Sequence, residues 1–333
     1  MRTRFKALAA LAAVAALTLA GCSSPSGEPA PGGEPAGGDE PFKVVAFTSG
    51  NQTPIGAWWV KAMDAKAKEL GWDMTMIQGD FDFQKMNPAV ESAIGQGADV
   101  VVDGYTDFAS IGSIVTAAKD AGIPMFAIDS GTEPSDAFVL NITTDQQGIV
   151  DQTLGAFDKA LGGLAGKTVM VIGHDPHAGI RLRASLAEKA LKAAGAEIAN
   201  GEIQKVESPA TGRTEALKLV ADYLAAHPDG LDAIWVGWDD AALGAAQAVK
   251  EAGSHAVVSG VDATSEAIAG IQAGGAFLAT IEQPWPSILD DLIKQIEAYR
   301  ADGTLPSNNF EAVQANLVTK DNAASITPSD KLG

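Results

Sequence analysis

The sequence predicts an α/β protein with two parallel sheets that share one cleft, and two observations lead to this class. Short apolar segments alternate with helical segments along most of the chain, which is the pattern of layered α/β folds. The second half also repeats the first: an apolar strand, a glycine, an aromatic residue and carboxylates occur at 100–107 and at 234–240. In each half an aspartate, Asp129 or Asp262, follows that glycine by 25 residues and ends the next strand. Ligands bind outside the carboxyl ends of parallel strands, so both halves contribute polar groups to the predicted cleft.

The first residues predict a leader rather than a folded element. Three basic side chains precede an apolar segment at 8–19, which is short for a membrane span. It ends in Leu-Ala-Gly-Cys at 19–22, which resembles the lipobox of bacterial lipoproteins. We expect residues 1–21 to be a signal peptide and Cys22 to carry the lipid. The alternative is an ordinary secretory signal with a chance cysteine.

Residues 22–41 are rich in Ser, Pro, Gly and Glu, and we expect a flexible tether there. Cys22 is the only cysteine of the chain, so neither an intramolecular disulfide nor a cysteine-rich metal site is expected. The net charge is −19, and removal of the three basic residues of the leader makes it −22. This charge argues against nucleic acid as a partner.

The elements follow from apolar runs of strand length and from apolar residues at helical spacing, ended by glycines such as Gly71. Strands are expected at 43–48, 72–77, 99–102, 124–128, 138–142, 168–172, 197–204, 233–236, 256–261 and 277–281. Helices are expected at 55–70, 84–94, 108–121, 145–161, 179–194, 212–226, 240–252, 264–273 and 286–301, with an extended piece at 311–318.

Three segments carry a family resemblance: Gly-Ile-Pro-Met-Phe-Ala-Ile-Asp at 122–129, Trp-Asp-Asp-Ala-Ala-Leu-Gly-Ala at 238–245 and Val-Ser-Gly-Val-Asp-Ala-Thr at 258–264. In this order they resemble the periplasmic sugar-binding proteins of ABC transporters, in the type I, ribose-binding-like group. The resemblance covers 43–317. It implies two doubly wound lobes joined by three hinge crossings, near residues 143, 282 and 313. The implied lobes are 42–143 plus 282–312 and 144–281 plus 313–333.

The resemblance also implies ligand-binding residues. Trp58 and Trp59 match paired aromatics that stack on a sugar ring, although adjacent helical residues point about 100° apart and both could instead be packed. Arg181 matches the ligand-binding arginine of the family, and Arg183 faces another way. The alternative for Arg181 is a surface ion pair.

The aspartates complete the implied set. Asp129 would accept hydrogen bonds from ligand hydroxyls, or cap the next segment. Ser130 follows it where the family has an arginine, which puts ribose itself in doubt. Asp239 stands where much of the family has Asn, whereas Asp262 and Gln283 match as they stand. The neighbouring residues Trp238, Asp240 and Trp285 are left open between cleft and packing or capping roles.

No cofactor, catalytic group or metal site is expected. His174 and His177 have a spacing that suits metal binding, but nothing in the sequence completes a site. The glycine-rich stretch at 162–168 lacks the first glycine of a phosphate loop and precedes a strand rather than following one.

We therefore expect an extracytoplasmic lipoprotein, held at the outer face of the cytoplasmic membrane, that binds a sugar or polyol as a monomer and delivers it to an ABC permease. The alternatives are a receptor for a cationic or nucleoside-like solute, favoured by the carboxylates and tryptophans, and a sensory receptor on the same fold. An enzyme is not expected, because no nucleophile–base pair is evident.

Overall fold

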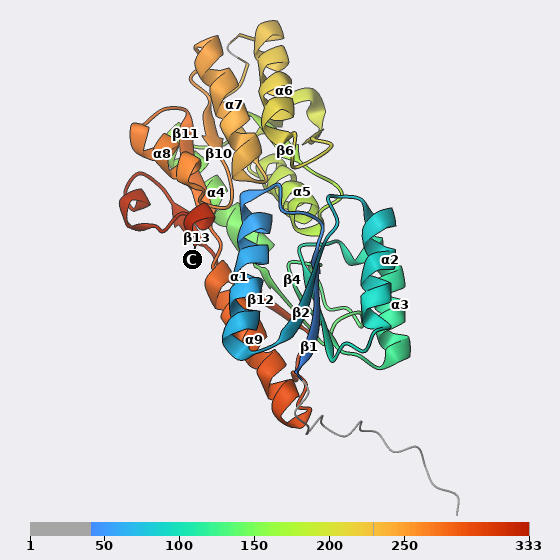
Figure 1. The fold of residues 1–333 in the computed structure, drawn as a ribbon. Coiled ribbons are helices and arrows are strands. Elements are labelled where there is room, and N and C mark those ends of the chain that lie inside the picture. Colours follow the sequence, from blue (N-terminus) through green and yellow to red (C-terminus); the bar gives the residue numbers. More distant parts are fainter. Residues whose placement is uncertain (1–40, 229, 333) are drawn as a thin grey trace, which may run out of the picture. The chain divides into compact units, whose positions relative to one another are not determined.

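The computed structural model describes residues 41–228 and 230–332 (Figure 1). The predicted leader, the predicted lipidation site Cys22 and nearly all of the predicted tether lie outside these residues. Among the helices that are described, none combines the length and the apolar composition needed to cross a membrane.

The first sheet has six strands in the order β12-β5-β4-β3-β1-β2, and every pairing is parallel. The strands are β1 (Lys43–Thr48), β2 (Asp73–Gln78), β3 (Val100–Gly104), β4 (Met125–Ile128), β5 (Leu140–Thr144) and β12 (Phe310–Val313). Its helices are α1 (Pro54–Leu70), α2 (Phe83–Ile94), α3 (Gly112–Ala121) and α9 (Trp285–Asp302).

Helices cover both faces of this sheet, with α1 and α9 on one side and α2 and α3 on the other (Figure 1). Side chains alternate across a strand, so β1 divides its apolar residues between two cores. Val44 and Ala46 pack towards α1 and α9, whereas Val45 and Phe47 pack towards α2 and α3. A strand covered on both faces needs an unbroken apolar run, which is the pattern that made it predictable.

The second sheet has the order β13-β11-β10-β9-β6-β7, with β8 also pairing with β6. All its pairings are parallel except that of β13, which is antiparallel to β11. The strands are β6 (Thr168–Gly173), β7 (Glu197–Ile198), β8 (Gln204–Lys205), β9 (Ala233–Val236), β10 (Val257–Ser259), β11 (Phe277–Glu282) and β13 (Asn316–Val318). The helices are α4 (Gln146–Leu161), α5 (Ala178–Ala193), α6 (Gly212–Ala226), α7 (Asp239–Ala252) and α8 (Ser265–Ala273).

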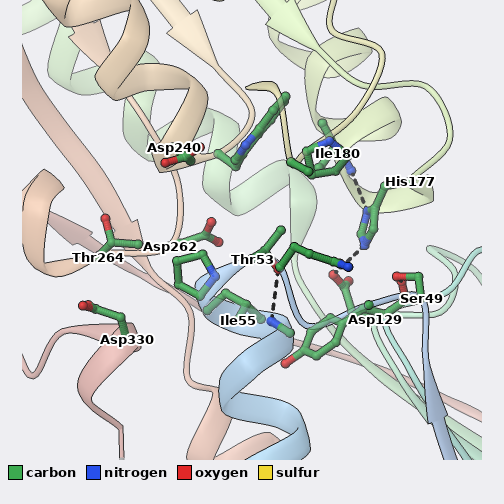
Figure 2. Close-up of a pocket in the computed structure, with 18 of the residues that line it drawn as sticks. Ser49, Thr53, Ile55, Asp129, His177, Ile180, Asp240, Asp262, Thr264 and Asp330 are labelled. Atoms are coloured by element: carbon green, nitrogen blue, oxygen red, sulfur yellow. Dashed lines mark hydrogen bonds and ion pairs between the residues drawn. The ribbon is translucent and has the colours of Figure 1, made fainter. Parts of the chain in front are cut away.

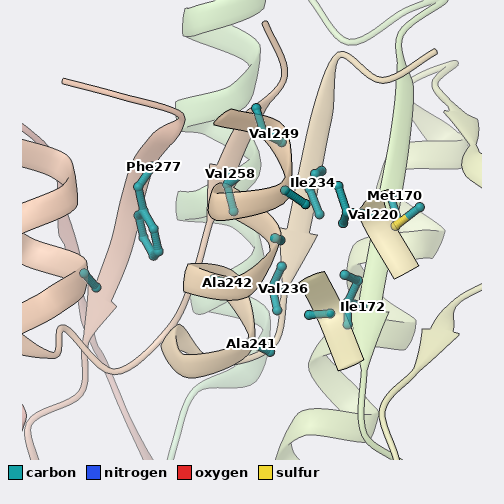
Figure 3. Close-up of a cluster of buried hydrophobic side chains, with 14 of the residues drawn as sticks. Met170, Ile172, Val220, Ile234, Val236, Ala241, Ala242, Val249, Val258 and Phe277 are labelled. Atoms are coloured by element: carbon teal, nitrogen blue, oxygen red, sulfur yellow. The ribbon is translucent and has the colours of Figure 1, made fainter. Parts of the chain in front are cut away.

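The larger core of this second body lies between the sheet and the helices α6, α7 and α8 (Figure 3). Met170 and Ile172 of β6 contribute to it, together with Ile234 and Val236 of β9. The other faces of these strands pack against α4 and α5. The predicted fold class, α/β with two parallel-sheet lobes, is confirmed.

The chain passes between the sheets at three connections: from β5 to α4, from β11 to α9, and from β12 to β13. Two of these connections are bonded to each other, because Gln314 donates to Asp145 Oδ2 over 2.7 Å and the Asp145 backbone N–H donates to Val313 O.

Two expected elements are interrupted by 3₁₀ turns in the structure. The single strand expected at 197–204 is divided by the turn Ala199–Gly201, where Asn200 and Gly201 both adopt positive φ, into β7 and β8, which both run parallel to β6. The helix expected at 108–121 begins as a separate 3₁₀ turn, Phe108–Ser110, whose first turn is capped by Asp107; α3 starts only at Gly112.

Candidate ligand-binding site

A pocket of about 350 Å³ lies at the carboxyl ends of both sheets (Figure 2). The first sheet and α1 contribute one side of its lining, and the second sheet with α5, α7 and α8 contributes the other. This is the place where ligands bind in open α/β sheets. Its volume lies within the range of small-molecule sites.

Three residues at the pocket have an unfavourable backbone conformation, which is held by hydrogen bonds to neighbouring strands. Tyr105, Asp129 and Asp262 each follow a strand and have positive φ angles of 64°, 52° and 123°. Such conformations cost about 1–3 kcal/mol each in residues other than glycine and gather at functional sites. Each is fixed by one further sheet-like bond, since its N–H donates to Ile128, Ile142 or Ile281 of the adjacent strand.

Asp129 points into the pocket from the end of β4 and is 4% exposed. Thr143 of β5 donates its hydroxyl to Asp129 Oδ1. The other oxygen, Oδ2, lies 3.5 Å from His177 Nε2, which comes from the second body of the fold (Figure 2). The carboxylate is therefore held in place by one lobe and approached by the other.

Asp262 faces Asp129 across the pocket and accepts a hydrogen bond of 2.8 Å from Gln283 Nε2. Burial raises the pKa of Asp262 to about 7, although the nearby Arg183 charge and the Gln283 hydrogen bond lower it. The structure thus brings three predicted site residues, Asp129, Asp262 and Gln283, into one pocket.

Arg183, rather than the predicted Arg181, lines this pocket. The Arg183 side chain is 3% exposed, and its Nε donates to Gly179 O. Its NH1 atom has no hydrogen-bond partner among the described residues. Arg181 is 47% exposed and pairs with Asp107 at 3.0 Å. The two arginines lie two positions apart on α5 and so face different directions, and the expected position of Arg181 is corrected.

Trp58 and Trp59 are placed in the core between α1 and the first sheet, not in the pocket. Helix α1 begins at Pro54, so its first turn, including Ile55 and Gly56, reaches the pocket instead. Gly104 makes room for the Trp59 indole, since a Cβ at Gly104 would lie 2.3 Å from Trp59 Nε1. The expected stacking position of the two tryptophans is therefore corrected.

Other aromatic residues take the pocket wall: Tyr105, Trp238 and Trp285. Tyr105 and Trp285 pack edge to face with ring centroids 5.1 Å apart. Trp59 meets Tyr105 from behind at 6.0 Å, also edge to face. Trp59 thus supports an aromatic residue of the pocket rather than forming its surface. Tyr105 and Trp285 thus form an apolar surface on the first-lobe side of the pocket, and Trp238 lies on the second-lobe side.

Asp239 lies beneath the pocket and is 0% exposed. It accepts hydrogen bonds from Thr264 N at 2.8 Å and from Thr280 Oγ1 at 2.6 Å, which join α7, β11 and the loop before α8. Burial, followed by the charge of Asp262, raises its pKa well above the usual range. Asp239 was expected in the cleft, and this expectation is corrected. Its two neighbours Trp238 and Asp240 line the pocket instead.

Several pocket residues escaped prediction. The sequence suggests only a metal-binding role for His177, through its spacing from His174. Within the described chain, no cluster of His, Cys, Asp and Glu is placed to hold a metal. Arg213 lies at the pocket and pairs with Asp240 at 2.6 Å and with Glu266. Asp330 reaches the pocket from the C-terminal segment, where it accepts a hydrogen bond of 2.7 Å from Ser265 N. No local pattern marked Arg213 or Asp330 in the sequence.

Comparison with known proteins decides the family. A sequence model described as a periplasmic binding protein domain matches residues 44–303. The chain belongs to this family. The D-apiose import binding protein of Paraburkholderia graminis is 30% identical over 267 residues, which cover 79% of this chain and 82% of that protein. The ribose import binding protein of Bacillus subtilis is 26% identical over 74% of this chain and 75% of its own length.

Solved structures agree on the fold of this periplasmic binding protein. An ABC transporter solute binding protein from Agrobacterium vitis with bound allitol superposes with a TM-score of 0.77 at 23% identity, covering 85% of this chain and 97% of the other. A myo-inositol binding protein from Caulobacter gives 0.73 at 22% identity, over 87% and 98% of the two chains. The predicted family resemblance is confirmed.

Proposed function

We propose that this protein is the extracytoplasmic solute receptor of an ABC importer and binds a neutral sugar or polyol between its two lobes. The observation that carries the proposal is the mixed polar lining of one pocket, with carboxylates from both lobes, a buried arginine and an amide. Relatives named for D-apiose, ribose and xylitol support this class of ligand.

The chemistry of the lining suits a polyhydroxy compound. A hydroxyl group both donates and accepts hydrogen bonds. Asp129 and Asp262 supply acceptors, Arg183 supplies donors, and the Gln283 amide can do both. The apolar C–H faces of a sugar would pack on Tyr105 and Trp285 from the first lobe and on Trp238 from the second.

Transport requires no chemical step at this pocket, and we propose that the protein is not an enzyme. Its work is to bind the solute more tightly in a closed state than in an open one. The hinge would lie at the three connections between the sheets, which divide the chain into lobes 42–143 plus 282–312 and 144–281 plus 313–333.

The proposed location and partners follow from the first residues and the charge. We place the mature chain at the outer face of the cytoplasmic membrane, held by a lipid on Cys22 and the tether 22–41. It would act as a monomer with an ABC permease as its protein partner. The strong negative charge argues against nucleic acid.

A solute that carries an amine is the second candidate, and one observation favours it. Within the described residues five carboxylates line the pocket, against two arginines. Arg213 is already paired with Asp240 and Glu266, and Arg183 lies near both Asp129 and Asp262. Asp330 is the fifth of these carboxylates.

A thermal-shift screen of wild-type protein separates the two candidates. The panel contains D-apiose, ribose, xylitol, allitol and myo-inositol as neutral ligands, and glucosamine and spermidine as cationic ones. A ligand that binds the native state raises the unfolding temperature by mass action. We expect saturable shifts from at least one neutral compound. Shifts from the cationic compounds alone would favour the second candidate.

A further inference from the structure

The hydrogen bonding of His177 shows which of its two ring nitrogens carries the proton. It is the N-cap of α5, and its Nδ1 accepts the backbone N–H of Ile180 at 3.3 Å. An Nδ1 atom that accepts carries no proton, so the neutral ring carries its proton on Nε2. Burial lowers the pKa of His177, which keeps the ring neutral at pH 7. The helix start therefore fixes which nitrogen is the donor.

The Nε2 atom lies near a carboxylate of the other lobe. Nε2 lies 3.5 Å from Asp129 Oδ2, and Figure 2 draws this contact next to the Ile180 bond. An N–H···O hydrogen bond is usually 2.7–3.2 Å long, so the two groups are near each other but do not form a direct hydrogen bond. Asp129 Oδ1 is occupied by the Thr143 hydroxyl, which leaves Oδ2 as the oxygen that faces the pocket.

One oxygen atom can lie about 2.8 Å from both groups at this separation. It would have to donate to Oδ2 and accept from Nε2–H. A hydroxyl does both, whereas an ammonium group only donates and a carbonyl oxygen only accepts. The pair therefore selects a hydroxyl by the direction of its two hydrogen bonds.

We propose that His177 and Asp129 together hold one hydroxyl group of the ligand, with Asp129 Oδ2 accepting its proton and His177 Nε2–H donating to its oxygen. This inference rests on the proposed function and adds a specificity-determining residue to it. Asp129 follows β4 of the first sheet, and His177 precedes α5 of the second body. The shared hydroxyl thus links the two lobes, so recognition and closure involve the same contact.

The test separates the helix cap from the ligand contact. Serine is a good N-cap residue but is too short to reach Asp129, so His177→Ser keeps the cap and removes the donor. His177→Ala removes both. The probe is whichever of D-apiose, ribose, xylitol, allitol and myo-inositol binds wild-type protein most tightly by calorimetry. We expect the dissociation constant to rise about tenfold in both variants, and the unfolding temperature of ligand-free protein to fall more in His177→Ala.

Deoxy analogues of the same probe show whether the contact is direct. Replacing one ligand hydroxyl at a time by hydrogen weakens binding to wild type at each contacted position. At the position held by His177 the two losses should not add in His177→Ser, because the contact is already absent. Unchanged affinity in His177→Ser, or additive losses at every position, would overturn the inference while leaving the proposed function in place. Failure of wild-type protein to bind any of the five probes would overturn the proposed function and the inference with it.

Discussion

The choice between Arg183 and Arg181 gives the sharpest single-residue prediction. Both arginines lie on α5, two positions apart, and each can be changed to methionine, which keeps an unbranched side chain and removes the charge. Arg183 is buried at the pocket, near Asp129 and Asp262. Arg181 is half exposed and pairs with Asp107. Arg181→Met is therefore a matched control for Arg183→Met.

The two variants should differ in affinity by at least about sixfold. Removing a charged partner from a buried, hydrogen-bonded binding site costs about 2–5 kcal/mol, which weakens affinity by about 30-fold to several thousandfold. Arg181 lies outside the pocket and is 47% exposed, although its partner Asp107 is only 8% exposed. Since Arg181 makes no contact in the pocket, we expect Arg181→Met to change affinity by less than about fivefold.

Calorimetry with the tightest neutral ligand measures both variants, and circular dichroism checks that both are folded. An Arg181→Met variant that loses as much affinity as Arg183→Met would contradict the placement of the two side chains. An Arg183→Met variant with wild-type affinity would contradict the role of Arg183 in binding.

Three further predictions concern pH, the core and the anchor. Burial raises the pKa values of Asp262 and Asp103 to about 7, above the usual value near 4, so the folded state keeps protons that the unfolded state releases. The unfolding free energy should therefore fall as pH rises from about 4 to about 7. In urea titrations, that fall should be less steep for Asp262→Asn than for wild type. Trp59→Phe should lower the unfolding free energy by about 1–3 kcal/mol while changing ligand affinity by less than about threefold, and a large loss of affinity with intact stability would return Trp59 to the binding surface. Cys22→Ser should move the protein from the membrane fraction to the soluble fraction of its host, and retention at the membrane would refute the lipid anchor.

The sequence predicted the fold closely because a strand buried on both faces is an unbroken apolar run. The expected strand 43–48 coincides with β1, and 233–236 coincides with β9. The errors lie where local geometry overrides composition. Asn200 and Gly201 interrupt the strand expected at 197–204 with a turn, and neither residue type by itself forces that turn.

The structure brings together the site residues predicted at strand ends and places those predicted at helix starts outside the pocket. Asp129, Asp262 and Gln283 follow strands, whose carboxyl ends must meet at the pocket edge. For Trp59 and Arg181, a shift of two or three residues along a helix turns a side chain from pocket to core or surface. The direction in which a helical side chain points depends on tertiary packing, such as the space beside Gly104. No local sequence pattern reveals that packing.

The C-terminal segment shows the same dependence on tertiary structure. Ser329 N donates to Ala263 O, and this contact holds Asp330 beside the pocket loop before α8. The two partners lie far apart in sequence, so Asp330 could not be assigned to the pocket before the fold was known.

Calorimetric titration of wild-type and Asp262→Ala protein with the neutral panel and with the cationic compounds tests the central claim most directly. We expect one-site binding of a neutral sugar or polyol by wild type, weakened at least about 30-fold in Asp262→Ala, because the variant removes a charged acceptor from the pocket. Binding of a cationic compound alone, or binding of a neutral compound with unchanged affinity in Asp262→Ala, would contradict it.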